Sequence, residues 1–251
     1  MIKFFRQIRY DLMEKNKTGR YFKYAIGEII LVVIGILIAL SINNWNSNRI
    51  QKQKESLLLS ELNNEFKANK IQLDSVLAKH KHALKSVDYL ISRLPIKNVK
   101  SENLDSLSYH IYHLGTFYTF NPSGGVINSL MNSSSINIIS NNKLRQLIIG
   151  WNDVLLDYQE EETLARDNYN NHLKQFEKEH FNYNRNYYKF LKDSRIDLSI
   201  LQTLEFDNYV QDRRFDLDNI LNNSYGELDT IINTIDKIIE LSETKNNDQL
   251  H

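Results

Sequence analysis

Two histidines in this sequence have a spacing that could bind a metal ion. His110 and His113 are three residues apart in LDSLSYHIYHLG, a segment whose apolar residues recur with the period of a helix. Residues three apart lie on one face of a helix, so both imidazoles could contact one zinc or copper ion. No carboxylate is expected on that face. His110 and His113 are therefore a weak candidate, and we predict no metal and no cofactor for this protein.

Other titratable groups have spacings that are less suited to chemistry. His80 and His82 are two residues apart, so they would point in different directions on a helix. Glu177 and His180 form one Glu-x-x-His motif, whereas a di-iron site in a helical bundle needs two such motifs on separate helices. We therefore expect Glu177 and His180 to lie on a solvated face.

The sequence carries no recognisable catalytic motif. It has no cysteine, no G-x-S-x-G elbow and no glycine-rich phosphate loop. The run from Glu160 to Glu162 covers most of the circumference of a helix, so it cannot direct two carboxylates at one glycosidic bond. We expect this run to be exposed to water, and we predict that the protein is not an enzyme.

A further segment could contact an anion or a partner protein. The glycines that end FNPSGG, Gly124 and Gly125, would leave backbone amides accessible, and a helix that begins near Ser140 or Asn141 would favour an anion at its N-terminus. Arg145, one turn further on, could pair with a carboxylate or a phosphate. The alternative is structural: the polar residues cap helices, the glycines form turns, and Arg145 bridges to a neighbouring helix.

These groups must be positioned by helices, and the first helix contains a long apolar stretch. Residues 24–42, YAIGEIILVVIGILIALSI, have one ionisable side chain, Glu28, and their apolar residues would face every direction around a helix. Such a helix is roughly 28 Å long, close to the thickness of the hydrocarbon core of a bilayer. We predict a transmembrane helix, with Glu28 reaching back toward the headgroups. A cleaved signal peptide that ends at ALS, residues 39–41, is the alternative.

Small residues recur on one side of the predicted transmembrane helix. Gly27, Gly35 and Ala39 are separated by multiples of four residues, a spacing that allows helices to approach each other closely. They form a possible packing face for a second copy of this chain or for another envelope membrane protein.

The flanks of the apolar stretch predict its orientation. Residues 1–23 are rich in Lys and Arg and contain only Asp11 and Glu14 as acidic residues. The positive-inside rule places this N-terminal segment in the cytoplasm and everything after the span outside it. IKFFRQIRYDLMEKN has the pattern of an amphipathic helix on the membrane surface, although a solvated basic tail is the alternative. Beyond residue 24 acidic residues outnumber basic ones, so we predict no nucleic-acid partner.

The rest of the chain reads as helical. Eight glycines and two prolines interrupt its 251 residues, and the segments between them have helical periodicity. We predict an all-α fold: an N-terminal amphipathic helix, a transmembrane helix that continues as a stalk helix to Leu94, and an antiparallel helical bundle within residues 43–251. The later helices are expected over residues 104–115, 126–131, 140–181, 204–221 and 225–241.

Two stretches of this sequence resemble a known family. Residues 1–46, MIKFFRQIRYDLMEKNKTGRYFKYAIGEIILVVIGILIALSINNWN, are similar to the N-terminal signature of a large family of uncharacterised single-span bacterial membrane proteins that share a domain of unknown function. FNPSGGVINSLMNSSSINIISNNKLRQLIIGW resembles the second characteristic stretch of that family. The resemblance implies a bacterial inner membrane protein with a helical domain, and it implies no catalytic residue.

Two functions remain open at this stage. The first is an interaction or scaffold module of the cell envelope, tethered to the lipid bilayer and docking envelope proteins or itself. The second is an extracytoplasmic domain that binds a small molecule and acts as a sensor. The short cytoplasmic segment contains no signalling domain, so a sensor would act through a separate membrane partner.

Overall fold

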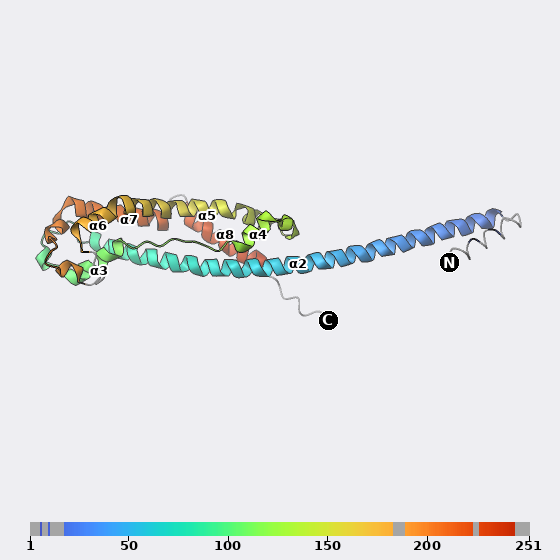
Figure 1. Ribbon diagram of the computed structural model, residues 1–251, viewed down its shortest axis with the longest axis horizontal. Helices are drawn as coiled ribbons and strands as arrows, with labels where there is room; N and C mark the ends of the chain where they lie inside the picture. Colours follow the sequence, from blue (N-terminus) through green and yellow to red (C-terminus); the bar gives the residue numbers. More distant parts are fainter. Residues whose placement is uncertain (1–5, 7–9, 11–17, 183–188, 223–225, 244–251) are drawn as a thin grey trace. The chain divides into compact units, whose positions relative to one another are not determined.

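The protein is mainly helical in the part of the chain that its computed structural model describes. This part comprises residues 18–182, 189–222 and 226–243, together with Arg6 and Tyr10. Most of the predicted amphipathic segment, residues 1–23, therefore lies outside the described residues. No strand occurs in the described ranges, which confirms the all-α prediction. The α-helices are α2 (Thr18–Ile91), α3 (Leu104–Leu114), α4 (Gly125–Asn132), α5 (Asn142–Asn168), α6 (Lys174–His180), α7 (Leu204–Asn222) and α8 (Glu227–Ser242) (Figure 1).

Shorter helical turns connect these helices. Four of them are 3₁₀ turns, and one, directly after α5, is a π-helical turn. They are η1 (Val99–Ser101), η2 (Ser134–Ile138), η3 (Tyr169–Leu173, the π turn), η4 (Phe190–Lys192) and η5 (Leu198–Gln202).

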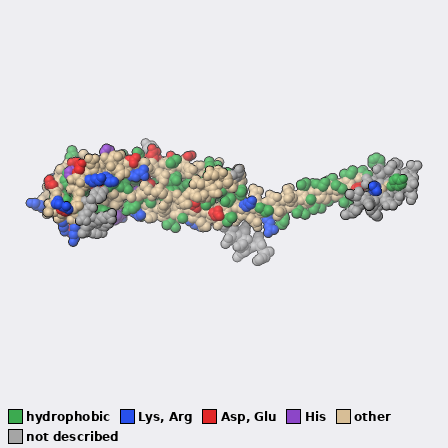
Figure 2. Space-filling view, in the orientation of Figure 1, with side chains coloured by type: hydrophobic (Ala, Val, Ile, Leu, Met, Phe, Trp, Pro, Cys, Tyr) green, Lys and Arg blue, Asp and Glu red, His purple; other side chains and the backbone are tan. Residues whose placement is uncertain are grey.

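The contacts of the chain divide it into two compact units, Met1–Ser56 and Leu57–His251. Within the first unit, α2 contains an 18-residue window with a mean hydropathy of 2.8, and none of that window is buried. Elsewhere in the described ranges no other helix is both long and apolar enough to cross a bilayer. The large side chains of this stretch are about half exposed or more, as Ile29 (63%) and Leu31 (65%) illustrate, and Figure 2 shows hydrophobic side chains along it.

In the second unit, α2 buries one stripe of its surface. This stripe contains Leu62, Phe66, Leu73, Leu77 and Val87, which are almost completely buried. The helix ends at Ile91, three residues before the predicted end, and a short turn joins it to Pro95. The physical reason is that the proline ring disfavours helical geometry in the residue that precedes it.

Two apolar cores lie along this unit. In the first, the edge of Phe66 meets the ring of Trp151 from α5, with the ring centroids 4.8 Å apart. It also contains the apolar faces of α4 and α8. The second core surrounds Val87 and Leu90 and contains the apolar faces of α3, α6 and α7. Residues of α2 therefore belong to both cores, with Leu62 to Leu77 in the first and Ala83 to Leu90 in the second.

The helices of the bundle do not simply alternate in direction. Phe66 and His80 of α2 contact Trp151 and Glu162 of α5, in the same order along both helices, so α5 runs parallel to α2. In α8 the order is reversed: Asn63 bonds to Ser242, whereas Lys70 pairs with Asp236. Thus α8 is antiparallel to α2, as predicted, and α5 is not. The chain can restart α5 in the direction of α2 because the non-helical residues 116–124 first carry it back along the bundle (Figure 1).

Residues 116–124, the extended segment, belong to no helix or sheet that could provide hydrogen-bond partners for their backbone N–H and C=O groups. Polar side chains of the neighbouring helices do so instead. Glu162 accepts a hydrogen bond from the Phe120 N–H (2.9 Å), and Gln159 donates one to the Phe120 carbonyl (2.6 Å). Asn69 bonds to both the N–H and the carbonyl of Ser123, each at 2.8 Å. A buried backbone group without a partner would be costly, so these side chains are the reason that an extended segment is tolerated inside the bundle.

The position of Glu162 corrects one prediction. We expected the run from Glu160 to Glu162 to be exposed to water, but Glu162 is only 3% exposed. Besides the Phe120 N–H, its carboxylate accepts a hydrogen bond from the hydroxyl of Tyr158 (3.2 Å) and lies 3.5 Å from His80 Nε2. The carboxylate is buried because the extended segment supplies a donor to it in the core.

Candidate functional site

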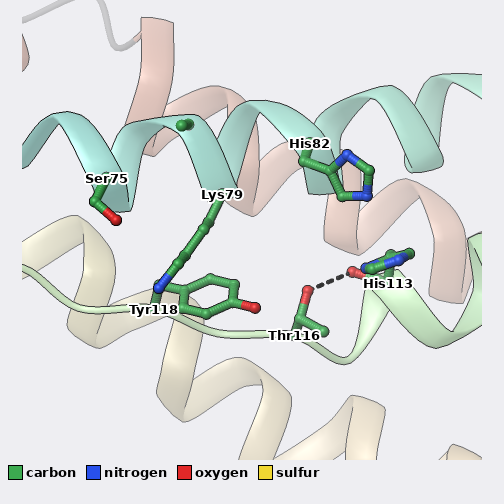
Figure 3. Close-up of a pocket in the computed structure, with 7 residues that line it drawn as sticks. Ser75, Lys79, His82, His113, Thr116 and Tyr118 are labelled. Atoms are coloured by element: carbon green, nitrogen blue, oxygen red, sulfur yellow. Dashed lines mark hydrogen bonds between the residues drawn. The ribbon is translucent and has the colours of Figure 1, made fainter.

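A surface pocket lies between α2, the C-terminal end of α3 and the residues that follow α3. It has a volume of about 280 Å³ and is lined by Ser75, Ala78, Lys79, His82, His113, Thr116 and Tyr118 (Figure 3). The four lining residues of α2 are separated by three, one and three positions, so they share one face of the helix. The buried stripe of α2 lies beside this face, which places the pocket at the edge of the bundle.

Two imidazole rings form one end of the pocket. The rings of His82 and His113 lie nearly perpendicular, with centroids 4.6 Å apart, and they come from different helices (Figure 3). His82 Nε2 is 2.9 Å from the hydroxyl of Tyr109. The Thr116 hydroxyl donates to the backbone carbonyl of His113 (2.9 Å) and so fixes the turn after α3. The structure thus brings together two histidines that are far apart in the sequence.

A lysine and a tyrosine form the other end of the pocket. Lys79 Nζ lies 4.5 Å from the centroid of the Tyr118 ring, within the range of a cation–π contact (Figure 3). Among the described residues that line the pocket, none is acidic. The charge of Lys79 is therefore not neutralised within the pocket.

His113 in the pocket and His110 beside it favour their neutral form. Burial, followed by the nearby charge of His82, lowers the pKa of His113. The pKa of His110 is lowered to about 4, chiefly by burial and then by His113, Arg93 and His82. Both shifts have the same physical origin: the rings are partly removed from water, and their charged neighbours are cations.

The structure places His110 and His113, the two weak candidates for metal ligands, in different surroundings. His113 lines the pocket beside His82, whereas His110 stacks on the ring of Tyr89, with centroids 3.8 Å apart. Within the described ranges no group of three or more His, Cys, Asp or Glu residues is arranged to hold a metal ion. His82 was not predicted as a site residue, because its partner His113 lies on another helix and is far away in the sequence. The spacing of Ser75, Lys79 and His82 on one polar face was the signal that could have indicated it.

Asn141 and Arg145, two residues of the predicted anion or partner contact, form hydrogen bonds within the first turn of α5. Asn141 caps α5, because its side chain accepts a hydrogen bond from the Leu144 N–H (3.1 Å). Arg145 donates to the side chain of Asn142 in the same helical turn, and the neighbouring Ser140 is exposed. The cap formed by Asn141 agrees with the alternative that these polar residues cap helices. Arg145, however, forms its hydrogen bond within α5 rather than to a neighbouring helix.

A second group of polar residues lies inside the bundle. The carboxylate of Glu177 accepts hydrogen bonds from Tyr209 (2.7 Å) and Tyr169 (2.9 Å), so the prediction of a solvated face is wrong for Glu177. Arg213 is completely buried and donates to the carbonyl of Thr116 (2.8 Å). Burial raises the pKa of Glu177 and lowers that of Arg213 to about 10. Tyr169 is the first residue of the π turn η3, which begins directly after α5.

Comparison with protein families now identifies the chain at the level of a family. A family model described as a family of unknown function, DUF6090, matches residues 28–175. The chain belongs to DUF6090. The matched range of DUF6090 begins within the apolar stretch of α2 and includes every residue that lines the pocket. It also includes Asn69, Gln159 and Glu162, which hold the extended segment, and it ends before α7 and α8. Searches of curated proteins and of solved structures gave no match for this chain.

Proposed function

We propose that this protein is a single-pass membrane protein that presents a helical interaction or scaffold module on the outer side of the bacterial inner membrane. In this proposal residues 24–42 span the bilayer, residues 1–23 lie in the cytoplasm, and residues 43–251 form the extracytoplasmic domain. The observation that carries the proposal is the apolar window of α2, of which no part is buried within the protein.

The hydrophobic effect supplies the physical reason for a membrane. A fully exposed Leu, Ile or Val side chain forgoes about 1.5–3 kcal/mol relative to a buried one, and many such side chains follow one another from Ile26 to Ile42. A bilayer would shield all of them at once, because a helix satisfies its own backbone hydrogen bonds. Only α2 offers this combination of length and composition among the described helices.

Cysteine labelling tests the anchor and its orientation. The chain contains no cysteine, so Ser60→Cys, at an exposed position of α2, gives a single reactive thiol. We expect an impermeant maleimide to label this variant in intact spheroplasts. Gly19→Cys is the matched control, because a side chain at Gly19 would meet no atom within 4 Å and the residue lies in the proposed cytoplasmic segment. It should react only after lysis. The reverse pattern would overturn the orientation, and recovery of the protein in the soluble fraction would overturn the anchor.

A second experiment tests the proposed interaction surface in the span. A side chain added at Gly27 or Gly35 would meet no atom within 4 Å, so Gly35→Ile is tolerated by a single copy of the chain. We expect Gly35→Ile to reduce co-purification of a second copy or of an envelope partner, because the larger side chain prevents close approach of another helix. Leu37→Ile, on a different side of α2, is the control and should leave recovery unchanged. Equal recovery with Gly35→Ile would count against the span as an interface.

The pocket favours a second candidate function. A hollow of about 280 Å³ with several polar side chains would suit an extracytoplasmic domain that binds a small molecule. In this second proposal the domain acts through a separate membrane partner. Binding of a small molecule in the pocket, measured on the purified full-length chain, would favour this function over a scaffold.

A further inference from the structure

We propose that the pocket formed by Lys79, His82, His113 and Tyr118 binds a small multivalent oxyanion, with inorganic phosphate as the simplest member of this class. The proposal rests on the second candidate function and is independent of the membrane anchor. It names the chemistry of the ligand, which neither the family match nor the fold specifies.

The side chains that line the pocket are mainly hydrogen-bond donors. Lys79 supplies an ammonium group, and each imidazole of His82 and His113 donates from one nitrogen when neutral and from two when charged. Ser75 and Tyr118 add hydroxyl groups. No carboxylate is found among the described lining residues, so an oxyanion would meet donors and positive charge without an opposing negative group.

The same inventory argues against a metal cation. Two imidazoles could bind zinc, but the described lining residues provide no further His, Cys, Asp or Glu. The ammonium of Lys79, held beside Tyr118 in the same pocket, would repel a cation. No acidic side chain of the described residues forms an ion pair with Lys79, so this charge is available to an anion.

Protonation of the histidines should be linked to anion binding. The titratable groups in contact with His113 are His82 from α2 and Tyr109 and Tyr112 from α3, and His110 interacts with it electrostatically. Lys79 and Tyr118 line the same pocket. Burial and His82 lower the pKa of His113 in the free pocket. A bound dianion would favour the imidazolium form and raise this pKa. Uptake of one proton on binding strengthens the affinity by up to about tenfold for each unit of pH. A dianion that keeps its own charge over this range, such as sulfate, should therefore bind more tightly as the pH falls from about 8 to about 6.

Histidine NMR on the full-length chain tests this proposal. The protein would be labelled with ¹³C-histidine and held in a maltoside detergent, which contains no phosphate group. We expect sodium phosphate to move the resonances of His82 and His113 in a saturable way. Sodium sulfate, which is a dianion at both pH values, should do so at lower concentration at pH 6 than at pH 8. Sodium chloride at equal ionic strength should not move them. His82→Gln and His113→Gln assign the two resonances, and the exposed His172 serves as an internal reference.

Two lysine variants and one metal titration decide whether the pocket binds an oxyanion through Lys79 or binds a metal cation instead. Lys79→Gln should weaken the response to phosphate at least about tenfold, the loss expected for one charge-assisted contact. Lys81→Gln, an exposed neighbour outside the pocket, should respond as the wild type does. The proposal is overturned if chloride acts like phosphate, if Lys79→Gln responds normally, or if zinc chloride moves the two resonances and phosphate does not. Normal membrane insertion together with such a result would leave the membrane anchor intact and remove only this site.

Discussion

Replacing Glu162 should destabilise the helical domain, because this carboxylate satisfies two buried donors. In Glu162→Leu the Phe120 N–H and the Tyr158 hydroxyl would lose their acceptor in the core. Each buried group left without a partner costs about 1–3 kcal/mol, so the expected loss in free energy of unfolding is about 2–6 kcal/mol. Burial of the carboxylate is itself unfavourable, and its removal offsets part of this cost. We therefore expect a net loss of about 2–4 kcal/mol.

Denaturation of the full-length chain in detergent would measure this loss. For a unit of this size, 1 kcal/mol lowers the melting temperature by roughly 2–4 °C, so the variant should melt about 4–16 °C below the wild type. Glu160→Leu is the control. Glu160 lies two residues before Glu162 on α5 and is exposed, so its replacement should change the free energy of unfolding by no more than about 0.5 kcal/mol. Equal stabilities of Glu162→Leu and Glu160→Leu would refute the role assigned to the buried carboxylate.

Three further predictions concern two glycines, Gly115 and Gly150, and the buried carboxyl group of Asp216 in α7. Gly115→Ala should lower stability by about 1–3 kcal/mol in thermal denaturation, because the new Cβ would lie 2.6 Å from Glu177 Oε1, which two tyrosines hold in place. Gly150→Ala, at a helical position where a side chain meets no atom within 4 Å, should raise stability by about 0.5–1 kcal/mol. Asp216, whose pKa burial raises to about 6, binds its proton more tightly in the folded protein than in the unfolded one. Stability should therefore fall as the pH rises from about 4 to about 6, and Asp216→Asn should flatten that part of the pH profile; an unchanged profile would contradict the assignment.

The helices could be predicted from the sequence because each one buries a stripe with a regular period. Ile231, Ile235 and Ile238 of α8 are buried at helical spacing, and the same rule places Leu62 and Phe66 of α2 in the core. The cap at Asn141 was also predictable, since only local backbone amides are involved. These features depend on residues that are close together in the sequence.

The buried carboxylates could not be predicted by the same reasoning. Glu162 and Glu177 look like members of a hydrophilic helix surface, and for each of them one donor, Phe120 or Tyr209, is far away in the sequence. The donors are Phe120 and Tyr158 for Glu162, and Tyr169 and Tyr209 for Glu177. Several of these residues lie on other elements, so the need for a carboxylate appears only once the chain is folded. The pocket was missed for a related reason, because His82 and His113 meet across two helices.

The extended segment connects the buried polar residues to the pocket. Thr116 and Tyr118 line the pocket, while Phe120 and Ser123 further along the segment are held by side chains of α5 and α2. At the other end, Arg213 holds the Thr116 carbonyl. Two walls of the pocket are thus fixed by hydrogen bonds made in the core rather than by regular secondary structure.

We therefore expect that loss of a hydrogen bond in the core changes the positions of residues that line the pocket. If Glu162 is replaced, the Phe120 N–H loses its acceptor and only the bond from Gln159 to the Phe120 carbonyl remains. Tyr118, two residues away, should then lose its fixed position beside Lys79. A folded Glu162→Gln variant, which keeps one acceptor oxygen, should therefore show altered resonances for His113 and a weaker response to phosphate, although it changes no lining residue. An unaltered His113 resonance in that variant would show that the pocket is held by α2 and α3 alone.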